Sequence, residues 1–261
     1  MSKYSLIDTL VRRVLKIKWG TTTILGKPFR DTSSIIYYNP IEHLTFLGKQ
    51  KIYYEADLQN KISKYISQGN LIFDIGANIG QYALLFSTIV GTNGKVISLE
   101  PDCDNFAILS LNKYKNKCNN LILINKGLDF IEQEKILYKD KVTGGRKSSF
   151  FKEFSTLNSE QQTTNTITFN TLIEQFGTPH FVKIDIEGYE GVIVSQLSSQ
   201  ILTKPITWFI EVRESSKEEC FKRFSSTHIC YVLDKKHTEE ISNPKEIPDF
   251  ANLLFIPNIL S

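Results

Sequence analysis

The segment LIFDIGANIG, residues 71–80, joins an apolar run to a turn that contains Gly76 and Gly80. A short apolar run that ends at glycines is typical of a buried strand. Residues 79–90 then have the apolar spacing of a helix. A strand, a tight turn and a helix make the first half of a βαβ unit, with the turn at the carboxyl end of the strand.

The same order recurs along the chain. We expect further strands at residues 95–100, 121–125, 181–185 and 206–212, with helices at 105–114, at 172–176 and from about 191. This alternation predicts an α/β fold with a doubly wound, Rossmann-like, mostly parallel sheet. Only a short link separates residues 228–233 from 252–256, so the last strand is expected to pair antiparallel. The polar stretch 129–165 is expected to form a loop or hairpin, with a surface loop at 156–166.

Composition narrows the class of protein. The chain has 261 residues, of which 41% are hydrophobic and 23% charged, which excludes a disordered chain and a disulfide-stapled miniprotein. The net charge of +3 argues against a nucleic-acid partner. The four cysteines form no C-x-x-C pair and no metal-ligand pattern, and no apolar run approaches the roughly 20 residues of a membrane span. We therefore expect a cytoplasmic protein with no metal site.

The sequence divides into two regions that differ in composition and in predicted secondary structure. Residues 1–55 form a predicted N-terminal extension with a basic amphipathic helix and short antiparallel strands, which include residues 33–39 and 51–55, and residues 56–261 form the main domain. The helix has apolar residues at helical spacing and cations such as Arg12, Arg13 and Lys16 on its other side. Two interpretations stay open: the helix packs on the main domain, or it makes a peripheral contact with an anionic membrane surface. The oligomeric state is not predicted.

The strand ends indicate a ligand, because open α/β sheets bind ligands at the carboxyl ends of their strands. Gly76 and Gly80 permit a close backbone approach, and the helix that follows offers free N–H groups to a carboxylate. Glu100, at the next strand end, can accept two ribose hydroxyls. Asn78 replaces the second glycine of a pyrophosphate-binding loop, which argues against NAD. Asp74 suits an ammonium group, so the combination describes S-adenosylmethionine (SAM).

Four segments then show a family resemblance. FDIGANIGQYALLFS (residues 73–87), VISLEPD (96–102), VKIDIEGYE (182–190) and FIEVRE (209–214) resemble the FkbM-type methyltransferases, a branch of the class I SAM-dependent family. The resemblance implies a class I methyltransferase fold with SAM as cofactor. It also implies a set of cofactor-binding residues: Asp74, Gly76, Asn78, Gly80, Gln81, Glu100 and Asp102.

The candidate catalytic residues are acids. His180 and His228 precede their strands and are expected at the far end of the sheet, and His43 and His237 are expected to be structural. A carboxylate at a strand end can take a proton from an acceptor hydroxyl. Asp185 is therefore the first candidate base, followed by Glu187 and Glu211.

The acceptor is predicted less directly. The N-P-P-Y or D-P-P-Y motif of many nitrogen methylases is missing after residue 184, which favours oxygen. The resemblance implies hydroxyls of sugars, glycans or secondary metabolites. The expected function is SAM-dependent O-methylation of a small-molecule or glycan acceptor. The alternatives are a nucleotide-binding oxidoreductase of the NAD type and a non-catalytic, membrane-associated SAM-binding protein.

Overall fold

The chain folds around one large twisted sheet. The computed structural model describes residues 11, 13–16, 22–139, 148–152, 160–233 and 238–258. Within this part the main sheet has eight strands, in the order β13-β12-β14-β11-β10-β3-β4-β5. The bounds are β3 (Leu71–Ile75), β4 (Lys95–Leu99), β5 (Leu121–Ile124), β10 (Phe181–Ile184), β11 (Thr207–Arg213), β12 (His228–Leu233), β13 (Thr238–Ile241) and β14 (Phe250–Pro257).

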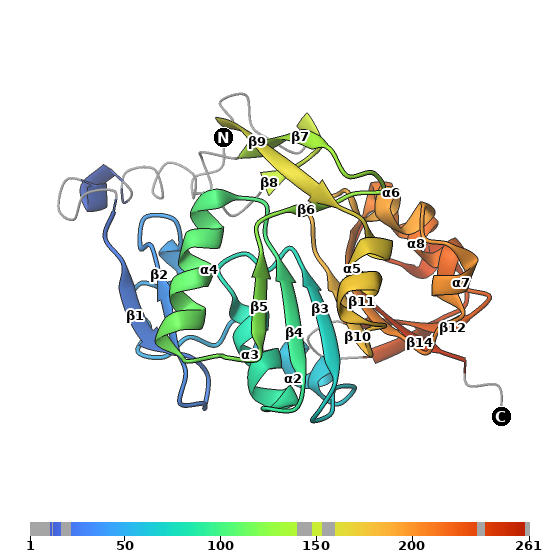
Figure 1. Cartoon of the computed structure of the whole chain (residues 1–261), viewed down its shortest axis with the longest axis horizontal. Helices are drawn as coiled ribbons and strands as arrows, with labels where there is room; N and C mark the ends of the chain where they lie inside the picture. The colour runs from blue at the N-terminus through green and yellow to red at the C-terminus, as the bar shows by residue number, and fades with distance from the viewer. Residues whose placement is uncertain are drawn as a thin grey trace.

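Strand directions confirm the predicted topology. β3, β4, β5, β10 and β11 run parallel, and β14 lies antiparallel between β11 and β12. One edge strand, β13, was not predicted and pairs antiparallel with β12. The described fold is therefore the expected doubly wound sheet with an antiparallel last strand (Figure 1).

Two apolar layers cover the sheet, because successive residues of a buried strand point to opposite faces. Ile72 and Val96 pack with α2 (Ala56–Ser63), α3 (Gln81–Val90) and α4 (Cys103–Lys115). Phe73 and Ile97 pack with the helices of the other face. Those helices are α5 (Phe169–Phe176), α6 (Glu190–Ser195), α7 (Ser199–Leu202) and α8 (Glu214–Phe224).

A second sheet crosses the end of the main sheet where the parallel strands finish (Figure 1). We call it the cap sheet. It comprises β6 (Gly127–Leu128), β9 (Glu160–Ile167), β7 (Glu134–Lys139) and β8 (Ser148–Ser149), in that order. The expected loop at 156–166 is wrong from residue 160 onward, because residues 160–165 of β9 pair with β7 and Thr166 and Ile167 pair with β6. The hairpin expected within 129–165 is confirmed by that pairing.

The extension contributes a small two-stranded sheet. β1 (Leu25–Pro28) pairs antiparallel with β2 (Ile35–Tyr38), followed by the 3₁₀ turn η1 (Leu44–Phe46). A strand expected at residues 51–55 is wrong, because only Ile52 forms an isolated bridge, to Phe29. Asn112 of α4 holds the edge of β2: its side chain accepts from the Tyr37 N–H at 2.6 Å and donates to the Tyr37 carbonyl at 2.9 Å.

The N-terminal helix lies largely outside the described residues, of which 11 and 13–16 are helical. His237 and residues 144–147 of the polar loop also lie outside them. In the described part of the chain, no helix is both long and apolar enough to cross a bilayer. A second 3₁₀ turn, η3 (Pro244–Glu246), precedes β14.

Candidate functional site

A cavity of about 220 Å³ opens at the carboxyl ends of β3, β4 and β10. The main sheet contributes the Gly76 turn, Glu100 and Asp185 to its walls. The cap sheet contributes Leu137 and Ser148. The structure thus brings together several of the residues predicted from sequence, namely Gly76, Asn78, Gln81, Glu100, Asp185 and Glu187. Asp74, Gly80, Asp102 and Glu211 lie outside the cavity lining.

The turn after β3 lets its backbone come close to the chain that follows β10. Gly76 has φ +77° and Asn78 φ +53°, which turn the chain back toward α3. A Cβ at position 76 would lie 1.9 Å from the carbonyl oxygen of Asp185. Glycine is therefore required here by contact with β10 as well as by its own backbone angles.

Glu100 faces the cavity with its carboxylate already partly engaged. Its Oε2 accepts from the Asn78 N–H at 2.7 Å, and its Oε1 accepts from the Asp102 N–H at 2.9 Å. Each carboxylate oxygen can accept a second donor, so the group retains capacity for two hydroxyls. Burial, reinforced by the charge of Asp102, raises the pKa of Glu100 to about 8.

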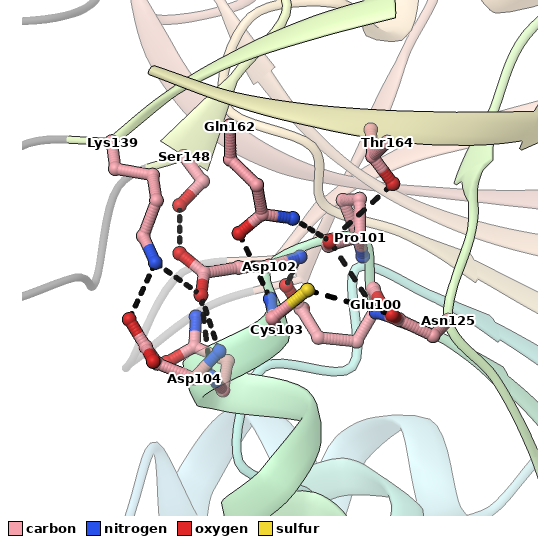
Figure 2. A network of polar contacts seen from close by, with 11 residues as sticks. Glu100, Pro101, Asp102, Cys103, Asp104, Asn125, Lys139, Ser148, Gln162 and Thr164 are labelled. Atoms are coloured by element: carbon pink, nitrogen blue, oxygen red, sulfur yellow. Dashed lines mark hydrogen bonds and ion pairs between the residues drawn. The ribbon is translucent and has the colours of Figure 1, made fainter. Parts of the chain in front are cut away.

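Asp102, a predicted cofactor-binding residue, has several partners within the protein. It caps α4 by accepting from the Asp104 N–H at 2.8 Å, and it also contacts Lys139 at 2.9 Å and Ser148 at 2.9 Å (Figure 2). Its side chain therefore fastens the cap sheet to the start of α4. Gly80, with φ +99°, precedes α3, where an added Cβ would lie 2.7 Å from Leu109.

A buried lysine, Lys183, was missed by the sequence analysis. Its Nζ lies 3.6 Å from Asp74 Oδ1 and 3.5 Å from Asp185 Oδ2, and it donates to the Gly76 carbonyl at 3.2 Å. Burial alone would lower the pKa of Lys183, but the carboxylates of Asp185 and Asp74 outweigh it and hold that pKa above its ordinary value. The sequence signal that could have identified Lys183 is its position as a charged residue within the otherwise apolar strand β10.

This lysine changes the role expected for Asp74. The carboxyl group of Asp74 is fully buried, and the ammonium that faces it is that of Lys183. Burial raises the pKa of Asp74 despite this partner. The Asp74–Lys183–Asp185 series therefore links the end of β3 to the end of β10.

The extension forms one wall of the cavity, which sequence reasoning also missed. His43, Thr45, Phe46 and Tyr54 all line it. His43 is 3% exposed, and its Nδ1 lies 3.3 Å from the Asn39 carbonyl. His180 and His228 lie as expected at the opposite end of the sheet, where His180 Nδ1 accepts from the Leu71 N–H at 3.1 Å.

The donor set fits SAM. Gly76 leaves room for backbone contact, Glu100 has spare acceptors for the ribose hydroxyls, and Gln81 lies at the N-terminus of α3, where free N–H groups suit a carboxylate. Among the described residues, no group of three or more His, Cys, Asp or Glu side chains could hold a metal ion.

Fold and site together define a class I SAM-dependent methyltransferase. The family description "Methyltransferase FkbM domain" matches residues 74–250, which is more than half of the chain. The chain therefore belongs to the FkbM methyltransferase family, and its cofactor is S-adenosylmethionine. No curated protein matches the sequence.

Several solved structures have a similar fold. A methyltransferase FkbM from Methylobacillus flagellatus shares 15% identity at a TM-score of 0.48, over 72% of this chain and 43% of that one, so this chain spans less than half of its length. A SAM-dependent O-methyltransferase from Thermotoga maritima shares 11% identity at 0.48, covering 87% and 74%. Aeropyrum pernix fibrillarin with bound SAM shares 12% identity at 0.49, covering 90% and 99%.

Replacing Glu100 tests the cofactor side of the site. We expect Glu100→Ala to weaken binding of both SAM and S-adenosylhomocysteine by about 1–3 kcal/mol, because both ligands lose charge-assisted hydrogen bonds to the ribose. Isothermal titration calorimetry measures both affinities. Unchanged affinity for both ligands would show that Glu100 serves only the two backbone N–H groups.

The raised pKa of Glu100 adds a pH dependence to the same test. In the free protein its burial favours the protonated form, so its contribution to stability is complete below about pH 4.5 and is lost as the pH rises toward about 8. Hydroxyl donors favour the charged form. SAM affinity should therefore rise between pH 6 and pH 8 in the wild type, and more steeply than in Glu100→Ala.

Proposed function

We propose that this enzyme transfers the methyl group of SAM to a hydroxyl oxygen of a sugar, a glycan or another secondary metabolite. The observation that carries the proposal is the position of Asp185. Its carboxyl group lines the cavity at the end of β10, beside the Gly76 turn and 3.5 Å from Lys183. A hydroxyl acceptor must lose a proton, and a carboxylate at this place can receive it.

The two other candidate acids are less suited to this task. Burial and the neighbouring charges of Asp185 and Glu187 raise the pKa of Glu211 to about 9, so Glu211 is protonated at neutral pH and cannot accept a proton. Glu187 forms an ion pair with Arg213. Asp185 is therefore the base that the arrangement favours.

Different residues would bind the cofactor, position the base and accept the proton. When bound, SAM supplies an electrophilic methyl group on a sulfonium sulfur. Glu100 and the Gly76 turn would hold the cofactor, and Lys183 fixes the Asp185 carboxyl group through their ion pair. Asp185 would take the acceptor proton as the oxygen replaces the sulfonium sulfur on the methyl carbon, with S-adenosylhomocysteine as the leaving group. Alignment of acceptor and cofactor supplies much of the rate enhancement, because it replaces a random encounter by a fixed geometry.

The wall formed by the extension supports a hydroxyl-bearing acceptor. Phe46 and Tyr54 present aromatic rings, while His43 and Thr45 present hydrogen-bonding groups. Such a mixture of apolar faces with a few polar groups is typical of small-molecule sites.

A transfer assay tests the proposal. The enzyme is incubated with methyl-labelled SAM and panels of sugars, glycans, hydroxylated metabolites, amines and RNA. We expect label in a methyl ether of a hydroxyl compound, with S-adenosylhomocysteine as co-product. Label on nitrogen alone, or on RNA alone, would contradict the proposal.

A further inference from the structure

Two neighbouring serines of the cap sheet bond to two different turns beside the cavity. Ser148 and Ser149 form β8, which pairs antiparallel with the end of β7. Successive residues of a strand point to opposite faces, so their hydroxyl groups diverge. Ser148 donates to Asp102 Oδ2 at 2.9 Å, whereas Ser149 donates to the Glu187 carbonyl at 3.0 Å.

The Ser148 contact reaches the cofactor side. Figure 2 shows Ser148 and Lys139 converging on the Asp102 carboxyl group. The backbone N–H of Asp102 in turn donates to Glu100 Oε1. Gln162 of β9 adds a bond to the Pro101 carbonyl at 2.8 Å. The cap sheet therefore fixes the turn at residues 100–102 that orients the Glu100 carboxylate.

The Ser149 contact reaches the catalytic side. Glu187 has φ +55° and Gly188 φ +99°, so the turn at residues 185–188 uses a backbone conformation that needs support. Glu190 supplies support from within by accepting the Ile186 and Gly188 N–H groups, each at 3.0 Å. Ser149 supplies it from the cap sheet.

A second link joins the cap sheet to the chain that follows this turn. Lys135 of β7 contacts Asp129 Oδ2 at 2.9 Å and the Tyr189 hydroxyl at 2.5 Å, and Tyr189 in turn donates to Asp129 Oδ1 at 3.0 Å. This network holds the chain just beyond Gly188, whereas Ser149 bonds to the backbone of the turn itself.

We propose that Ser148 and Ser149 are positioning residues that hold the cofactor-binding turn and the catalytic turn in register across the cavity. The catalytic half rests on the proposed function, because it takes Asp185 as the base. Neither hydroxyl is assigned a role in the chemistry itself. The two side chains act through Glu100 on one side and through the 185–188 backbone on the other.

Single substitutions test the Ser148 contact and the Ser149 contact separately. Each hydroxyl group acts on its turn indirectly, so we expect an effect of roughly 3- to 10-fold, the net scale of about one hydrogen bond. Ser148→Ala should weaken SAM binding by about that factor in calorimetry and speed amide hydrogen exchange at residues 100–105. Ser149→Ala should leave SAM affinity within about twofold and speed exchange at residues 185–190. With the acceptor found in the transfer assay, Ser149→Ala should lower kcat about 3- to 10-fold.

Controls distinguish positioning from a general loss of structure. Ser149→Thr keeps a hydroxyl group and should restore both the exchange pattern and kcat. Ser225→Ala, an exposed serine whose hydroxyl bonds only to the Lys222 carbonyl among the described contacts, should change neither. Equal effects of Ser148→Ala and Ser149→Ala on SAM affinity, or unchanged exchange in both turns, would overturn the proposal.

The exchange and calorimetry measurements need no acceptor. If the acceptor proves not to be a hydroxyl compound while the two exchange patterns still separate, O-methylation fails and the positioning role stands. If O-methylation is observed and exchange in the two turns does not separate, the positioning role fails alone.

Discussion

Gly76→Ala is expected to weaken SAM binding by about 100-fold or more. The added Cβ would lie 1.9 Å from the Asp185 carbonyl oxygen, a distance that real contacts do not allow, so the ends of β3 and β10 must separate. That movement displaces the cofactor turn and the candidate base together. Calorimetry with SAM measures the loss, and circular dichroism and a thermal melt report whether the sheet persists.

A matched variant isolates the cause. Gly69 also has a positive φ, +83°, but nothing lies within 4 Å of its Cβ position. Gly69→Ala should therefore cost about 1 kcal/mol of stability from backbone strain alone and leave SAM affinity unchanged. Normal SAM binding by Gly76→Ala would contradict the close approach of the two strands.

Asp185→Asn is expected to cut kcat by roughly 10²–10⁴-fold with SAM affinity changed less than about threefold. The amide keeps the shape of the side chain but cannot take the proton of a hydroxyl acceptor. Single-turnover kinetics with the acceptor from the transfer assay, together with calorimetry, measure the two quantities separately.

Glu211→Gln is the natural comparison. Because Glu211 is protonated at neutral pH, the amide resembles the group that it replaces, and turnover at pH 7 should stay within a few-fold of the wild type. Near-normal turnover in Asp185→Asn would exclude Asp185 as the base. A large parallel loss of SAM affinity would make it a cofactor-binding residue instead.

The main sheet and the cofactor turns could be predicted from sequence because their signals are local. Apolar runs that end at Gly76 or at Glu100 identify strands and their carboxyl ends without knowledge of any partner. The polar strand β9 could not be found this way, because Ile167 is the one apolar residue among its eight and its pairing with β7 decides its conformation.

Roles that depend on contacts between distant segments were also beyond the sequence. The family resemblance implies Asp102 as a cofactor residue, but the sequence gives no sign of its partners Lys139 and Ser148, which come from the cap sheet. Lys183 meets Asp74 only because β10 lies next to β3. His43 reaches the cavity only because the extension packs against α3 and α4.

The wall contributed by His43, Thr45, Phe46 and Tyr54 lies before residue 74, where the match to the FkbM domain begins. The matched region holds the glycine turn, Glu100 and Asp185, so the family match covers the cofactor side of the cavity and leaves this wall outside it. On the proposed function, this wall is the part of the cavity that can set acceptor preference. Exchanging residues 43–54 for those of a relative should then change acceptor preference more than SAM affinity.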